Sequence, residues 1–393
     1  MVVNTTGYLI VGAVAFLVTF VSTPIVVLFA RRFGLVVEPD ERRVHTRPTP
    51  DVGGIAMFAG FLAAMFIASK MGRFGELFAS NNSEPLGVVL ACSAVFAVGL
   101  IDDIHEISAP AKIAGTVVGG VLLVVFGVTM FFFRVPLWDV FVLSPDWAPL
   151  ITVLWLIGMT NAVNLIDGLD GLAAGIVAIA AGSYFLYSHH LDQEHFLKPP
   201  NIGPLIAIIA VGVCLGFLPH NFNPAKIFMG DGGALLLGAL MAVSTSVVGG
   251  RADPNTQQQF RGQTFFFYAP LFIPLVILGV PILDTLFAIV RRARKGGGLA
   301  TADKGHLHHR LMNLGHGQRR SVMILWLWTA LLSGFVLYPA FSQTGNAVVP
   351  LGIAAAALML YTILHPQIRR RAQRDEFVRP DDVTRKTDDI SSR

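Results

Sequence analysis

The stretch of the chain best suited to chemistry runs from residue 161 to residue 172 and reads Asn-Ala-Val-Asn-Leu-Ile-Asp-Gly-Leu-Asp-Gly-Leu. Its amides and carboxylates recur at every third position, a spacing that keeps them on roughly one face while the chain stays helical. These residues are Asn161, Asn164, Asp167 and Asp170. At the end of a membrane-length apolar run, such groups are costly unless they bind something. A capped helix end with a glycine turn is the simpler interpretation, but the shared phase favours a ligand or metal site.

A pair of adjacent carboxylates, Asp102 and Asp103, follows the apolar residues Leu100 and Ile101. Adjacent carboxylates repel, and each raises the proton affinity of the other unless a cation lies nearby. Acidic residues often end a membrane span, but a pair at this place indicates Mg²⁺ binding or acid–base chemistry. Lys112 follows near the start of the next apolar run, where it either reaches the membrane interface or neutralises a phosphate.

A third acidic position, Asp231, lies between glycines at the expected N-terminal edge of a helix. Free backbone N–H groups at a helix start bind phosphate, and glycine lets a ligand approach closely. An aspartate there can also be an ordinary N-cap, and a cap can be a metal ligand at the same time. Because Lys226 and Phe228 belong to the same segment, we favour a functional site.

Two basic segments add groups that suit a phosphate-bearing ligand. Residues 41–54 combine three arginines, Arg47 among them, with prolines and glycines typical of a shaped loop. The excess of positive charge on cytoplasmic loops is the alternative explanation for these arginines. The second segment carries His306, His308 and His309 beside Arg310. Three histidines could bind a transition metal, but the flanking cations and the lack of a nearby cysteine favour a clamp for a diphosphate or sugar.

Membrane-spanning helices must position these residues. The chain has 393 residues, of which 54% are hydrophobic and 14% charged, with a mean hydropathy of +0.64, whereas a soluble domain has about 25% charged residues. Long apolar runs without alternation exclude a membrane β-barrel. We therefore predict an all-α, polytopic integral membrane protein with about eleven spans of about twenty residues each. The spans lie near residues 7–30, 53–69, 86–101, 111–133, 148–166, 171–188, 203–218, 232–249, 264–290, 321–340 and 346–364.

The distribution of Lys and Arg predicts the orientation of the chain, because short cytoplasmic loops carry an excess of both. With the N-terminus outside and the C-terminus cytoplasmic, all but six of the 29 Lys and Arg residues lie in or beside inner segments. The exceptions are Lys70, Arg73, Arg134, Lys198, Arg251 and Arg261. We expect residues 1–365 to form a transmembrane domain and residues 366–393, which lack apolar periodicity, to form a disordered cytoplasmic tail.

Every polar motif described above falls on the inner side of this topology, although Lys and Arg alone set the orientation. Carboxylates, amides and basic loops on one face suit Mg²⁺-assisted phosphoryl transfer, with the membrane supplying one of the two substrates. Two other classes of protein are alternatives. A transporter of anionic sugars or nucleotides would place its polar groups near the bilayer midplane, and a non-catalytic lipid-binding scaffold would not need so many carboxylates.

Five segments together resemble the polyprenyl-phosphate N-acetylhexosamine-1-phosphate transferases, the superfamily that includes the MraY, WecA and TagO enzymes. They are residues 48–54, 102–103, 161–171, 223–231 and 306–310, so the resemblance covers roughly residues 10–365. It implies transfer of a sugar 1-phosphate from a UDP-sugar to a polyprenyl phosphate, with release of UMP and use of Mg²⁺ or Mn²⁺. The sequence departs from the family pattern at residues 232–234, where Gly-Gly-Ala replaces a segment that often contains hydroxyl side chains.

Residues 306–311, His-Leu-His-His-Arg-Leu, are similar to the WecA/TagO branch, which uses UDP-GlcNAc, whereas the MraY branch typically has three adjacent histidines there. The resemblance therefore implies transfer of GlcNAc-1-phosphate to undecaprenyl or decaprenyl phosphate, the first lipid-linked step of cell-envelope polysaccharide synthesis. We expect this reaction on the cytoplasmic face of the bacterial plasma membrane. An MraY-type phospho-MurNAc-pentapeptide transferase is the alternative within the superfamily.

Matching the family motifs position by position gives each candidate residue an expected role. Asn164 and Asp231 are expected to hold the metal. The substrate-binding group is expected to contain Arg47 and Lys112 together with the uridine-site residues Gly168, Leu169, Asp170 and Phe228. The catalytic group is expected to contain Asp102, Asp103, Asp167, His306, His308 and His309. Arg310 is expected to bind substrate, beside the histidines at the sugar or diphosphate.

The expected partners are UDP-GlcNAc, a polyprenyl phosphate and the bilayer. We expect no nucleic-acid partner, and a homodimer is one of the oligomeric states that the sequence allows. A polyprenyl phosphate is mostly dianionic above a second pKa of about 6, so a general base, for which Asp102 is the first candidate, would supply little of the rate. Positioning of two anions, with Mg²⁺ and cations offsetting their repulsion, should dominate.

Overall fold

The computed structural model describes residues 5–38, 48–79, 81–134, 140–194, 197, 200–249, 317–342 and 348–364. Ten α-helices lie in these ranges. They are α1 (Thr5–Arg32), α2 (Gly54–Lys70), α3 (Glu84–His105), α4 (Ala109–Val125), α5 (Trp147–Ile166), α6 (Leu172–Gln193), α7 (Gly203–Asn221), α8 (Gly230–Gly249), α12 (Gln318–Ser342) and α13 (Val348–Leu364). A 3₁₀ turn, η1 (Gly72–Phe74), follows α2. Two antiparallel hairpins join β1 (Val36–Val37) to β2 (Thr49–Pro50) and β3 (Phe132–Arg134) to β4 (Val140–Val142).

The mostly helical architecture predicted from the apolar runs is confirmed. Six of the helices are long and apolar enough to cross a membrane, and α2 and α4 are shorter apolar helices. Each predicted span overlaps a described helix except the one at 264–290, which lies outside the described residues, as does the predicted tail at 366–393. The two short hairpins have no counterpart among the predicted elements, because strands of two or three residues leave no readable period.

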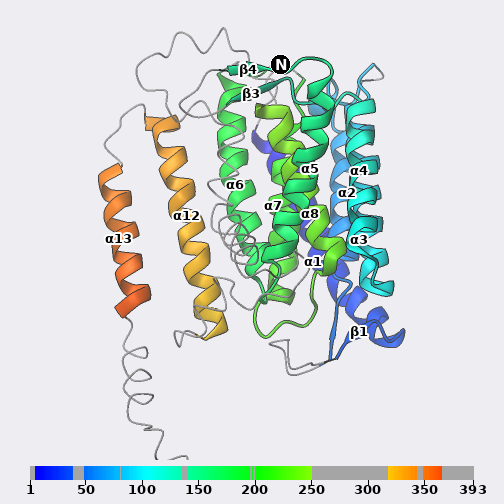
Figure 1. Cartoon of the computed structure of the whole chain (residues 1–393), viewed down its shortest axis with the longest axis vertical. Coiled ribbons are helices and arrows are strands. Elements are labelled where there is room, and N and C mark those ends of the chain that lie inside the picture. Colours follow the sequence, from blue (N-terminus) through cyan, green and yellow to red (C-terminus); the bar gives the residue numbers. More distant parts are fainter. Residues whose placement is uncertain are drawn as a thin grey trace, which may run out of the picture.

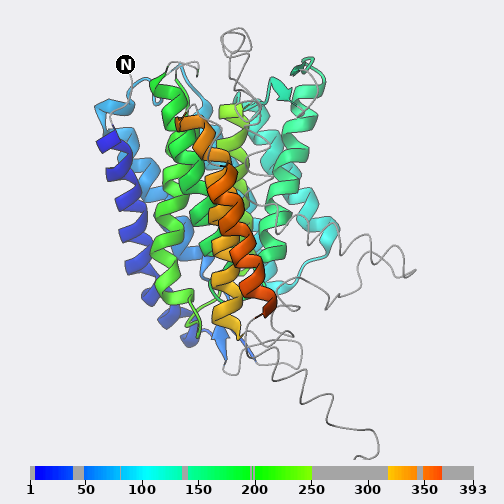
Figure 2. The same ribbon diagram turned by 90° about the vertical axis from the view of Figure 1, so that its left-hand side faces the viewer.

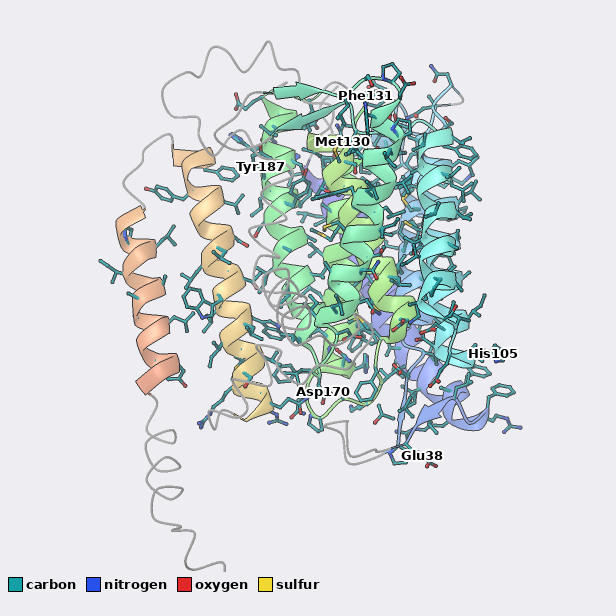
Figure 3. The ribbon with its side chains drawn as sticks, in the orientation of Figure 1. Glu38, His105, Met130, Phe131, Asp170 and Tyr187 are labelled. Carbon is teal, nitrogen blue, oxygen red and sulfur yellow. The ribbon has the colours of Figure 1, made fainter. Side chains whose placement is uncertain are left out.

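The helices stand side by side as one upright bundle, with α12 and α13 together at one edge (Figures 1 and 2). The segments between them alternate between the two ends of the bundle. Figure 3 shows Glu38, His105 and Asp170 at the lower end, and Met130 and Phe131 at the upper end. The acidic motifs at the end of α3 and directly after α5 therefore share one end of the molecule.

Helix α8 forms the centre of the bundle. In its apolar stretch 94% of the residues are buried, against 28% in α1, whose Leu17, Val21 and Leu28 side chains are exposed. A helix that is apolar and buried all round belongs inside a bundle, whereas an exposed apolar face on a spanning helix faces lipid. The first turn of α8, with Asp231, consequently lies in the middle of the lower end.

Glycines let two neighbouring helices approach the first turn of α8 backbone to backbone. A Cβ atom on Gly99 of α3 would lie 2.6 Å from the Cα of Gly232, and one on Gly54 of α2 would overlap the backbone nitrogen of Gly233. Only residues without a side chain permit this approach. It brings Asp102 and Asp103, which follow Gly99 by one turn, to the start of α8.

A proline in α1 is compensated by a side chain from α7. Pro24 has no backbone N–H, so the carbonyl of Phe20 lacks its usual donor within the helix. His220 supplies one, because its Nε2 lies 3.1 Å from the Phe20 oxygen, and the two rings pack with centroids 5.0 Å apart. A carbonyl oxygen only accepts, so Nε2 carries the proton.

Candidate functional site

The start of α8 is held by the carboxylate of Asp103. Its Oδ1 accepts a hydrogen bond from the backbone N–H of Asp231 at 2.6 Å, and its Oδ2 accepts one from the N–H of Gly232 at 3.0 Å. The first N–H groups of a helix have no partner within it, and a negative charge there is favourable. Asp103 thus caps α8 from another helix, and both of its oxygens are engaged.

The side chain of Asp231 makes different contacts from those of an N-cap. Its Oδ1 accepts a hydrogen bond from Nδ2 of Asn164 at 2.8 Å, and its Oδ2 lies 2.5 Å from Nζ of Lys112. The same ammonium group lies 2.6 Å from Oδ2 of Asp102. Lys112 therefore bridges the carboxylates of α3 and α8, and the amide at the end of α5 completes the cluster.

A tight connection between α3 and α4 places Lys112 over Asp102. Helix α3 ends at His105; the next residue, Glu106, has a left-handed backbone with φ of 45°, and Asp102 Oδ1 accepts the N–H of Ile107 at 2.8 Å. Helix α4 then begins at Ala109 with Pro110 in its first turn. The side chains of Lys112 and Asp231 remain 29% and 25% exposed, so a ligand can reach the bridge from solution.

The turn that follows α5 is tied to the loop that precedes α8. Asp170 Oδ2 accepts hydrogen bonds from Nδ2 of Asn223 at 2.8 Å and from the N–H of Ala225 at 3.0 Å. The buried amide of Asn221 accepts the N–H of Gly171 and donates to the carbonyl of Ile227, at 3.0 and 2.9 Å. Gly171 has φ of 76°, a conformation that glycine adopts without strain, and α6 begins directly after it.

Backbone hydrogen bonds fix a second loop against the one before α8. The N–H of Phe228 donates to Pro50 at 2.8 Å, and the N–H groups of Gly53 and Gly54 donate to Phe228 and Met229 at 2.9 and 2.8 Å. Glycine is needed at position 53, because a Cβ there would overlap the Phe228 carbonyl. These contacts bring Asp51 to the same end of the bundle.

Negative charge accumulates around Asp167, in the turn after α5. Burial among protein atoms is the main cause that raises the pKa of Asp167 well above its usual range, and four neighbouring carboxylates raise it further. They belong to Asp51, Asp231, Asp103 and Asp170. The residue still reaches solvent in part. Like charges in a partly desolvated site favour the binding of a cation.

The structure gathers most of the predicted site at one place and leaves some of it undescribed. It brings to the lower end Asp102, Asp103, Lys112, Asn164, Asp167, Gly168, Leu169, Asp170, Phe228 and Asp231. The remaining predicted residues, Arg47, His306, His308, His309 and Arg310, lie outside the described residues. The single helical face predicted for Asn161, Asn164, Asp167 and Asp170 is only partly present. Helix α5 ends at Ile166, before both aspartates, and Asn161 is exposed and donates to the carbonyl of Ile157 in its own helix.

Five further residues belong to this end of the bundle and are absent from the predicted site. Asp51, Asn221 and Asn223 lie inside or next to motifs that the sequence marks, so the motifs themselves were the available signal. Gln318 and Arg319 bond to Asn223. They begin an apolar helix, where the excess of positive charge on cytoplasmic segments is a sufficient explanation for an arginine. No local signal therefore marks them as part of the site.

The donor atoms fit a hard divalent cation. Within the described ranges no three His, Cys, Asp or Glu side chains form a ready metal cage. Mg²⁺, however, is commonly held by one or two carboxylates together with water and substrate phosphates. Asp231 offers a carboxylate whose two oxygens contact Asn164 and Lys112 in this structure, so a cation would take the place of one of these donors. Asn164 now points its amide nitrogen at Asp231, and rotation of that amide would present its oxygen to the same ion. The surplus of carboxylates gives the site a negative charge, which a bound cation would offset.

Apolar spanning helices with a cluster of carboxylates, amides and a lysine at one end define a multi-pass membrane protein with a polar site where its helices end. Residues 85–249 match the sequence profile of glycosyl transferase family 4. The decaprenyl-phosphate N-acetylglucosaminephosphotransferase of Mycolicibacterium smegmatis is 36% identical over 368 residues, 92% of this chain and 89% of that protein. The protein of the same name from Mycobacterium tuberculosis H37Rv is 37% identical over 380 residues, 95% and 91% of the two chains.

A relative from another group of bacteria extends this similarity. The probable undecaprenyl-phosphate N-acetylglucosaminyl 1-phosphate transferase of Bacillus subtilis is 36% identical over 315 residues, 80% of each chain. The chain therefore belongs to glycosyl transferase family 4, among the polyprenyl-phosphate N-acetylhexosamine-1-phosphate transferases, and the predicted family membership is confirmed.

Proposed function

We propose that this protein transfers GlcNAc-1-phosphate from UDP-GlcNAc to a membrane polyprenyl phosphate, giving polyprenyl-diphosphate-GlcNAc and UMP. The observation that carries the proposal is the cluster of Lys112, Asp231 and Asn164 at the start of the central helix. It lies at the end of the bundle, where a soluble donor and a lipid phosphate can meet. The named relatives, which match most of this chain, support the same reaction.

In this proposal Asn164 and Asp231 hold Mg²⁺ or Mn²⁺, and the ion, when bound, neutralises charge on the diphosphate. Gly168, Leu169, Asp170 and Phe228 line the uridine site, with Arg47 beside the nucleotide. The sugar or diphosphate is engaged by residues that follow the family motif: His306, His308, His309 and Arg310. Each assignment rests on the position of the residue in that motif.

The two adjacent aspartates take different roles in this scheme. Asp103 uses both oxygens to hold the backbone of α8, so we assign it to positioning Asp231 and not to proton transfer. Asp102 forms a salt bridge with Lys112 through its Oδ2, and this pair is suited to orienting the attacking lipid phosphate. That phosphate is already ionised near neutral pH, so orientation of the two anions supplies more of the rate than deprotonation.

The positive-inside rule supports a cytoplasmic location for this end of the bundle, because Arg31 and Arg32 end α1 there. The proposed topology retains about eleven spans with the N-terminus outside. A reporter fused to the C-terminus should then be active only in the cytoplasm, and activity outside the cell would contradict this orientation. A transporter is disfavoured, because the cluster lies at the ends of the helices and not near the middle of their length.

Release of UMP by the purified protein tests the reaction directly. In detergent micelles, release should require UDP-GlcNAc, decaprenyl or undecaprenyl phosphate, and a divalent cation. UDP-MurNAc-pentapeptide should support little release. A preference for that donor would move the protein to the MraY branch, and no release with either donor would overturn the proposed function.

A further inference from the structure

We propose that Gln318 and Arg319, in the first turn of α12, are positioning residues that orient Asp170 toward the donor nucleotide. This inference rests on the proposed function, in which Asp170 belongs to the uridine site. Neither residue belongs to the motifs of the sequence analysis, and neither bonds directly to Asp170 in the described contacts. Their effect passes through Asn223.

Asn223 is the common partner of all three side chains. Its Nδ2 donates to Asp170 Oδ2 at 2.8 Å and to Gln318 Oε1 at 2.7 Å. Arg319 approaches from the other side, and its Nε donates to the Asn223 backbone carbonyl at 2.8 Å and reaches the amide Oδ1 at 3.3 Å. The beginning of α12 thus meets a loop that is more than ninety residues away in sequence.

These contacts permit one orientation of the Asn223 amide. A carboxylate only accepts and a guanidinium only donates, so Nδ2 must face Asp170 and Oδ1 must face Arg319. A flipped amide would place its oxygen against the Asp170 oxygen and its N–H group against a cation. Without Gln318 and Arg319, only the contact with Asp170 opposes a flip of the Asn223 amide, and the amide can rotate toward solvent.

The orientation matters because it fixes one oxygen of Asp170 and leaves the other for a ligand. Both hydrogen bonds that Asp170 accepts from the described part of the chain end on Oδ2. Oδ1 is therefore held in place as an acceptor for an N–H or O–H group, which a nucleoside offers on its base and ribose. Side chains locked by such supporting bonds keep a binding geometry within tenths of an ångström.

Helix α12 is packed firmly enough to act as a support. Trp326, two turns beyond Arg319, lies against Gly175 of α6 so closely that a Cβ on that glycine would overlap the indole ring. Its ring also packs against Phe222, with centroids 5.7 Å apart. Phe222 directly precedes Asn223, so the aromatic contact and the hydrogen bonds fix the same loop from two sides.

The test separates positioning from a role in stability alone. Arg319→Gln and Gln318→Leu should each raise the KM for UDP-GlcNAc and the Kd for UMP, measured by calorimetry, by about tenfold, the factor for about 1.4 kcal/mol. The KM for the polyprenyl phosphate should not change. Gln318→Glu keeps the acceptor and should restore most of the UMP affinity. Arg320→Gln, which removes a charge at the next position, is the matched control and should bind UMP like the wild type.

A double-mutant cycle tests whether the effect passes through Asp170. In an Asp170→Asn background, Arg319→Gln should cause no further loss of UMP affinity. Full additivity would overturn the inference, as would a loss of thermal stability with unchanged UMP affinity. If the wild type releases no UMP at all, the proposed function fails. Normal turnover with unchanged UMP affinity in Arg319→Gln overturns the positioning role alone.

Discussion

Replacing Gly99 by alanine tests whether the contact between α3 and α8 sets the geometry of the site. The added Cβ would lie 2.6 Å from the Cα of Gly232 and 2.7 Å from the carbonyl carbon of Asp231. Carbon atoms that are not bonded pack at about 3.5 Å or more, so the two helices must part by about 1 Å. Both contacts are to backbone, which cannot move aside as the end of a flexible side chain would.

A separation of that size breaks the bonds that Asp103 makes to α8. Their lengths of 2.6 and 3.0 Å would become roughly 3.6 and 4 Å, beyond the range of a hydrogen bond. Overpacking costs about 1–3 kcal/mol, and loss of hydrogen bonds to a charged group adds about 1.5 kcal/mol or more. Because Asp231 moves with α8, kcat/KM should fall by roughly a hundredfold, a loss that a 1 Å misplacement can cause.

The measurements are the midpoint of thermal unfolding in detergent and the rate of UMP release. Gly158→Ala is the matched control, since Gly158 lies inside α5 and a Cβ there has no atom within 4 Å among the described residues. That variant should be active and slightly more stable, by up to about 1 kcal/mol, because alanine favours a helix. Wild-type activity and stability in Gly99→Ala would refute the role assigned to the contact.

Three further variants test other parts of the structure. Asp231→Asn keeps the size of the side chain and removes its charge, so turnover should nearly vanish with partial recovery at high Mn²⁺; a wild-type metal titration would show that Asp231 holds no metal. His220→Phe leaves the Phe20 carbonyl without its donor and should lower stability by about 1–3 kcal/mol without changing either KM, whereas His220→Gln, which retains a donor, should lose less. The pKa of Asp167 is raised in the folded protein, so the folded state binds the proton more tightly than the unfolded chain does. The resulting stabilisation is complete below the usual pKa of an aspartate and is lost as the pH rises through the folded pKa. In metal-free solution the unfolding midpoint should therefore fall less with rising pH in Asp167→Asn than in the wild type, and equal slopes would contradict the assignment.

The sequence predicts the helices well, because a membrane allows few alternatives to an apolar helix of sufficient length. Ten of the predicted spans overlap described helices for this reason. Composition and spacing also identify Asp102, Asp103, Asn164 and Asp231 as candidates. They cannot show that Asp103 binds the backbone of α8 while its neighbour faces Lys112, because that difference depends on the register of two helices far apart in sequence.

The same limit applies to side chains that act across the bundle. Pro24 in the sequence indicates an unsatisfied carbonyl one turn earlier, but nothing local indicates that His220 supplies the missing donor. Asn161 shows the opposite case, because its spacing matches that of Asn164 and yet it is exposed on α5. Periodicity assigns a residue to a face, and only the packing of α5 decides where that face ends.

The burial of α8 has a consequence for how the protein responds to the thickness of its membrane. Spanning helices adapt to a thicker or thinner bilayer by tilting, at a cost of fractions of a kcal/mol per ångström. That adjustment falls on helices in contact with lipid, such as α1, whereas α8 is enclosed by protein along almost its whole length. Asp103, Lys112 and Asn164 belong to α3, α4 and α5 and all contact Asp231 at the start of α8. Turnover should consequently vary little between vesicles of short-chain and long-chain lipids as long as these three helices keep their contacts with α8, even where α1 changes its tilt.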